Sequence, residues 1–97
     1  MSEDTVVALV LVAPEAAEPV ARALRADFEV GPHVGISMAI TAPRRTFERV
    51  FGAKVEDAPD GGWMAGGRRE LPLGQLPPEL GSQIRAVTFD EPAEPVS

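Results

Sequence analysis

The chain has 97 residues, enough for one domain with one modest hydrophobic core. Its 44% apolar and 25% charged residues argue against global disorder, and the absence of cysteine excludes disulfides and thiol chemistry. Fifteen acidic residues against nine basic ones give a net charge of −6, which argues against nucleic acid as a partner because phosphate binding needs a dense positive field.

The first predicted element is a strand over Thr5–Ala13, TVVALVLVA, which is rich in β-branched residues and leucine. Apolar residues on both of its faces are typical of a central strand covered on two sides. The run is too short to cross a bilayer, and it follows Glu3 and Asp4 where a signal peptide would carry cations. We therefore expect no membrane partner and a cytoplasmic location.

A helix is expected next, over Pro14–Asp27. Pro19 is unfavourable inside a helix, so we expect it to mark the first turn, with Pro14–Glu18 as a loose lead-in. The apolar spacing predicts a buried stripe formed by Val20, Ala23, Leu24 and Phe28.

The pattern then predicts a strand at Phe28–Val30, a break at Gly31–His33, and a further strand over Gly35–Thr41. Thr41 is expected to cap a second helix, with Pro43 in its first turn. The helix buries Phe47, Val50 and Phe51 and ends at a left-handed Gly52.

Short elements fill the remainder of the domain. We expect strands or turns at Ala53–Glu56, Asp60–Gly62, Trp63–Met64, Gly66–Gly67 and Arg68–Leu71, a connector over Leu73–Leu80, and a last strand over Gln83–Asp90. Residues 1–90 thus form one domain. Residues 91–97, EPAEPVS, are predicted to be a mobile acidic, proline-rich tail.

This order predicts an α+β, ferredoxin-like split βαβ sandwich, with an antiparallel sheet and two helices on one face. The other face is left uncovered by the chain itself. From side-chain size we assign Leu9, Leu11, Met38 and Ile40 to the helix side. The uncovered face is then expected to carry small residues suited to receiving a partner's helices or a second copy, namely Ala8, Val10, Ser37 and Ala39.

Catalytic and metal-binding patterns are not found in the sequence. His33 is the only histidine, and there is no G-x-S-x-G elbow beside it, so we do not expect an enzyme. Glu56, Asp57 and Asp60 lack the spacing of a calcium loop, and the glycines at 61, 62, 66 and 67 do not open a helix. We expect no metal and no cofactor.

Two features leave alternatives open. Arg44, Arg45 and Arg49 lie on the predicted exposed side of the second helix, where they serve as a solvated face or meet an acidic patch on a partner. Trp63, the only tryptophan, belongs either to the core or to an interface.

The stretch from Ile36 to Gly52, ISMAITAPRRTFERVFG, resembles the strand-to-helix step in the activation propeptides of sedolisin and kumamolisin serine peptidases. In those propeptides a strand ending in a small residue leads to a helix closing in an alanine- or valine-Phe-Gly, as Val50–Gly52 does here. The resemblance covers residues 34–92. It continues in the same order through Trp63, Gly67-Arg68, Leu71-Pro72, Leu76-Pro77, Ile84, Val87 and Phe89-Asp90.

The resemblance implies a fold like that of the related subtilisin propeptides. Such propeptides dock an open sheet face on two helices of the peptidase and place their carboxyl-terminal tail in the substrate cleft. The corresponding tail here would be Asp90–Pro95, with partner contacts from Phe89, Asp90, Glu91 and Pro92. The long first helical region of the family is reduced, and no peptidase domain is expected within these 97 residues, so the peptidase would be a separate chain.

Two functional hypotheses follow. The first is a non-enzymatic, propeptide-like inhibitor or folding assistant of a sedolisin- or subtilisin-type serine peptidase acting in trans. The alternative is a regulatory module that pairs its sheet faces in a homodimer and binds a small effector.

Overall fold

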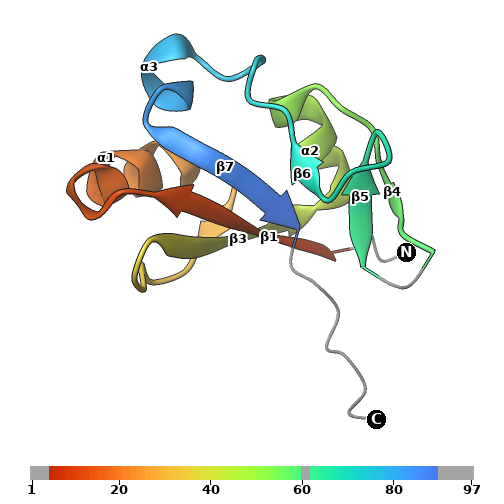
Figure 1. Cartoon of the computed structure of the whole chain (residues 1–97), viewed down its shortest axis with the longest axis horizontal. Coiled ribbons are helices and arrows are strands. Elements are labelled where there is room, and N and C mark those ends of the chain that lie inside the picture. The colour runs from red at the N-terminus through yellow and green to blue at the C-terminus, as the bar shows by residue number, and fades with distance from the viewer. Residues whose placement is uncertain (1–4, 60–61, 90–97) are drawn as a thin grey trace, which may run out of the picture.

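The structure is a computed structural model that describes residues 5–59 and 62–89. Figure 1 shows a single main sheet with helices packed against it. The chain forms β1 (Thr5–Val12), α1 (Pro14–Leu24), β2 (Glu29–Val30), β3 (Ser37–Pro43), α2 (Arg44–Phe51), β4 (Val55–Asp57), β5 (Trp63–Ala65), β6 (Glu70–Leu71), α3 (Pro78–Gly81) and β7 (Ile84–Phe89).

The main sheet has five antiparallel strands in the order β2-β3-β1-β7-β6. β1 lies at the centre, as predicted, and pairs with β3 on one side and β7 on the other (Figure 1). The expected cover on both of its faces is wrong, because the helices pack on one face only. Strands β2, β3, β1 and β7 with helices α1 and α2 make the split βαβ arrangement. The expected ferredoxin-like α+β fold is therefore confirmed.

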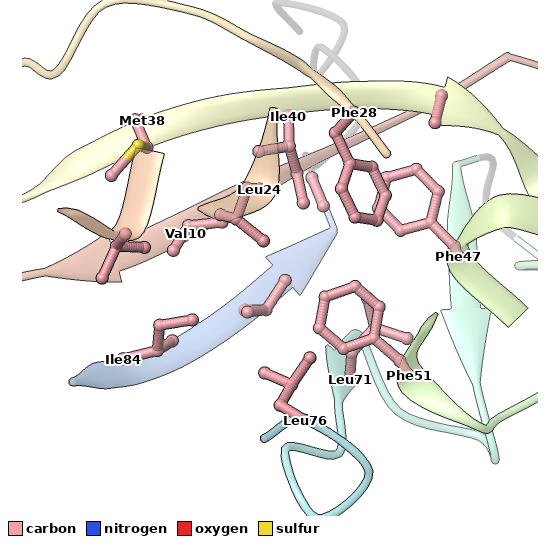
Figure 2. Packing of buried hydrophobic residues seen from close by; sticks show 14 of the residues in the cluster. Val10, Leu24, Phe28, Met38, Ile40, Phe47, Phe51, Leu71, Leu76 and Ile84 are labelled. Carbon is pink, nitrogen blue, oxygen red and sulfur yellow. The ribbon is translucent and has the colours of Figure 1, made fainter. Parts of the chain in front are cut away.

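Both long helices pack on the same face of this sheet. Their buried side chains join one hydrophobic cluster with alternate residues of the strands. Phe47 lies at its centre, with ring centroids 4.9 Å from Phe28, 6.1 Å from Phe51 and 6.4 Å from Phe89. Figure 2 shows the rings of Phe28, Phe47 and Phe51 in this cluster together with Leu24, Leu71 and Leu76. Edge-to-face and offset rings of this kind stabilise a core beyond their buried area.

Helix α1 begins earlier than its sequence predicts. It starts at Pro14 and includes Pro19, so the expected loose lead-in over Pro14–Glu18 is wrong. Pro14 occupies the first turn, where a missing N–H costs nothing, and the exposed Pro19 removes one internal hydrogen bond. Burial of Ala17, only one turn from the start, favours extending the helix through this segment.

Thr41 is not the cap of α2. It lies within β3, where its backbone pairs with Val7 and with Glu29, and the N-cap position is Pro43 with no side-chain cap bond. Pairing with β1 continues for two residues beyond Thr41, through Ala42 and Pro43. The helix then relies on the burial of Phe47 and Phe51.

Gly52 ends α2 in the left-handed conformation, with φ 69° and ψ 28°, as predicted. Its N–H donates to the Glu48 carbonyl at 2.9 Å, and the Glu48 carboxylate accepts a 2.9 Å bond from the Val55 N–H. These two bonds fix the exit from the helix and the start of β4.

We expect Gly52→Ala to lower the free energy of unfolding by about 1–2 kcal/mol, because a Cβ strains this left-handed backbone. The new methyl would also press on the Gln75 side chain. Chemical denaturation measures the change. Gly74→Ala is the matched control, since its added Cβ meets nothing within 4 Å; equal losses in the two variants would contradict the account.

The segment between α2 and β7 is an insertion in the split βαβ order. β4 and β5 form a separate two-stranded hairpin, and the Gly66-Gly67 turn after β5 is closed by two bonds between Ala65 and Arg68, of 2.7 and 3.1 Å. The expected strand over Arg68–Leu71 shortens to β6, and the expected connector contains the one-turn helix α3. Val55 and Ala65 are buried in the same cluster as α1 and α2, so the hairpin also lies on the helix side of the sheet.

Candidate functional site

No catalytic arrangement forms around the single histidine in the part of the chain that the structure describes. His33 lies in the β2–β3 loop, and its Nε2 is 3.2 Å from the Val12 carbonyl oxygen, a structural contact. Within residues 5–59 and 62–89, no group of three or more His, Asp or Glu side chains is placed to hold a metal ion.

The main candidate is the sheet face opposite the helices, here called the open face. Along β1, Val6, Ala8, Val10 and Val12 have no exposed surface, whereas the alternate residues Val7, Leu9 and Leu11 are half-buried. Because successive side chains of a strand point to opposite faces, the second set belongs to the open face.

The assignment of Ala8 and Val10 to the open face is therefore wrong. Both are fully buried, and Figure 2 shows Val10 among the core side chains beside Leu24. In β1 the larger residues Leu9 and Leu11 do not face the helices, because large side chains of the helices already occupy that space. Phe47 and Phe51 fill the space, so β1 supplies small residues beneath them.

The assignment of Ser37 and Ala39 agrees with the structure. Both are half-buried, while Met38 and Ile40 beside them are 1% and 0% exposed. In the register of the sheet, Leu11 lies opposite Ser37 and Leu9 opposite Ala39. Paired residues of an antiparallel ladder share a face, so these four side chains form one surface.

Register extends the open face across the sheet. On the β7 side, Ala86 lies opposite Leu11 and Thr88 opposite Leu9. The centre of the open face is then made by Val7, Leu9, Leu11, Ser37, Ala39, Thr41, Ala86 and Thr88. All eight are half-buried and none carries a charge.

The charges lie at the two borders of the open face. Glu29 on β2 pairs with Thr41, and Glu70 on β6 pairs with Thr88, so both exposed glutamates share the face of their partners. β1 and β3 contain no charged residue. β7 contains one, Arg85, which is exposed at the register shift opposite Leu11 and Val12.

One end of the open face carries an exposed apolar side chain on a tight turn. Val34 is 70% exposed and is bonded to Ser37 in both directions, at 2.8 and 3.0 Å. This bridge places Val34 on the same face as Ser37. Ile36, 48% exposed, holds the turn to β1 by accepting a 2.8 Å bond from the Val12 N–H.

The helices and the β4–β5 hairpin leave this face uncovered. Each contributes buried or partly buried side chains to the cluster on the opposite side, including Leu80 from α3. Two hollows, of about 410 and 310 Å³, lie outside the centre of the open face. The first is bordered by the Gly66–Leu73 region and the second by α1 and the β2–β3 loop.

Phe89 does not belong to the tail. It is 2% exposed, pairs with Ala8 in the sheet and packs 6.4 Å from Phe47, so its assignment as a partner contact is wrong. A large aromatic at the end of the last strand completes the core on the helix side. Asp90, Glu91 and Pro92 lie outside the described residues.

The remaining sequence candidates lie away from the open face. Trp63 is partly buried against the core, with the Arg44 guanidinium 5.8 Å from its ring centroid. This cation–π contact joins α2 to β5. Arg49 on α2 pairs with Asp27 at 3.1 Å, an exposed ion pair that contributes little to stability.

Comparison of the chain with protein-family models, with curated proteins and with solved structures finds no match. Among the described residues, no helix is long and apolar enough to cross a membrane.

Proposed function

We propose that this protein is a non-enzymatic, propeptide-like inhibitor or folding assistant of a serine peptidase of the sedolisin or subtilisin type, acting in trans. One observation carries the proposal. The eight central side chains of the open face are uncharged valine, leucine, alanine and small polar residues, and both long helices lie on the opposite side. Apolar patches of this kind mark protein-binding sites.

The ordered resemblance of residues 34–92 to activation propeptides supplies the class of partner. The split βαβ fold that the resemblance implies is the fold observed. In this proposal the open face docks on the peptidase, with Leu9 and Ala39 near its centre. The segment after β7, beginning at Asp90, approaches the substrate cleft.

Mixing the purified chain with sedolisin- and subtilisin-type peptidases tests the proposal. We expect inhibition at micromolar concentrations of the chain and a one-to-one complex on gel filtration. Recovery of denatured peptidase with and without the chain separates folding assistance from inhibition alone. Unchanged peptidase activity, no complex and no improved refolding would overturn the proposal.

Removing residues 91–97 separates docking from inhibition. The shortened chain should keep its dissociation constant for the peptidase within about threefold if the open face supplies most of the contact area. Its inhibition constant should rise by at least about tenfold, because the cleft loses a segment held there at high effective concentration. Equal losses in binding and inhibition would contradict this division of roles.

A further inference from the structure

The borders of the open face restrict what can cover it. Glu29 and Glu70 stand on opposite edge strands of the five-stranded sheet, both on the open face. Four strand spacings of about 4.8 Å separate these strands, and the row that holds Glu29 is two residues along β1 from the row that holds Glu70. The two residues therefore lie about 20 Å apart on the sheet. Between them the eight central side chains carry no charge.

A second copy of this chain fits such borders poorly. Two identical faces stacked about a two-fold axis bring an acidic edge against an acidic edge, whether the axis runs along the strands or across them. Each copy also carries a net charge of −6. Like charges that face one another across an interface oppose association by several kcal/mol.

Val34 adds a third point that breaks the symmetry of the face. Val34 lies beside Ser37 in the row of paired residues Ser37–Leu11–Ala86, at one end of the sheet. Along β3, this row is four residues from Thr41, which pairs with Glu29. At about 3.4 Å per residue this separation is about 14 Å. The short turn and its two hydrogen bonds hold Val34 in place, so little conformational entropy is lost when it is buried.

We infer that the open face is covered by the surface of a different protein, which is apolar at its centre and carries two cations about 20 Å apart, with a depression that receives Val34. Two acidic borders and one off-centre apolar contact fix a single docking orientation. This inference rests on the proposed function for the class of partner, and it adds what that partner must present.

The test uses the full chain and the peptidase to which it binds. Glu29→Lys with Glu70→Lys should weaken binding about tenfold and reduce its dependence on salt, because the border ion pairs become repulsive. Glu18→Lys is the matched control: Glu18 is exposed on α1, on the helix side of the sheet, and this variant should bind like the wild type. Equal binding by the double variant and the wild type would overturn the inference.

A second pair of variants tests the apolar contact. Val34→Asp should weaken binding at least about tenfold, whereas Ile36→Asp, two residues away and opposite the helix-facing Val12, should change it by less than about threefold. Equal effects at the two positions would overturn the assigned orientation. All five substituted positions are exposed, and thermal unfolding of each variant checks that the fold is kept.

Light scattering of the wild-type chain alone completes the test. We expect a monomer at low and at high salt. A dimer that is lost in Leu9→Lys would overturn the inference, because a second copy would then cover the face. If the wild type binds none of the peptidases tried, the proposed function is overturned. If the wild type and the double glutamate variant bind a peptidase equally well, this inference alone is overturned.

Discussion

Phe47→Ala is expected to lower the free energy of unfolding by about 3–5 kcal/mol. Phe47 has no exposed surface, and its ring lies within 6.4 Å, centroid to centroid, of Phe28, Phe51 and Phe89. Its removal leaves a cavity where α2 meets β7 and the segment between α1 and β2. Urea unfolding followed by circular dichroism measures the loss.

Val34→Ala is the control for this variant, because Val34 is 70% exposed and its truncation should change stability by less than about 0.5 kcal/mol. A domain of this size is stable by about 5–15 kcal/mol, so the Phe47 variant loses a large share of the total. A loss below about 1 kcal/mol would contradict the placement of Phe47 at the centre of the core.

Leu9→Lys is expected to weaken peptidase binding at least about a hundredfold while the domain stays folded. Leu9 is half-buried in the middle strand of the open face, between Ala39 and Thr88. A lysine there places a charge at the centre of the proposed contact, where it must be desolvated on binding. Calorimetric titration gives the affinity, and the far-ultraviolet circular dichroism spectrum checks the fold.

The neighbouring Val10 supplies the matched comparison. It has no exposed surface and points into the core, so Val10→Lys should unfold the domain under conditions in which Leu9→Lys is folded. If both variants unfold, the two faces of β1 are not distinguished as described. If Leu9→Lys folds and binds like the wild type, the open face is not the docking surface.

The order of elements was predictable because each carries a local signal. The alternation in β3, the apolar spacing of α2 and the glycine that ends it all agree with the final structure. The direction in which β1 faces was not predictable, since both of its faces are apolar. Only the register with β3, whose own faces differ in polarity, decides that Leu9 is on the open side and Val10 in the core.

Two local predictions failed where tertiary contacts outweigh local preference. Thr41 has the chemistry of a helix cap, but its backbone is held by pairing with strands on both sides. Pro19 has the chemistry of a first turn, but burial of Ala17 before it extends the helix.

The site itself was predictable only in part. The existence of an uncovered face follows from the fold, and Ser37 and Ala39 were placed on it by alternation within one strand. Glu29 and Glu70 were not singled out, because two-residue edge strands carry no periodicity that assigns a face. Their common face emerges only from pairing with Thr41 and Thr88.

The most direct test of the open face as a docking surface is nuclear magnetic resonance mapping of the labelled chain during titration with a peptidase. Signals of Val7, Leu9, Leu11, Ala39 and Thr88 should shift or broaden first, while those of exposed Glu15, Arg22 and Arg45 on the helices should change little. Changes concentrated on α1 and α2, with the open-face signals unmoved, would contradict the account.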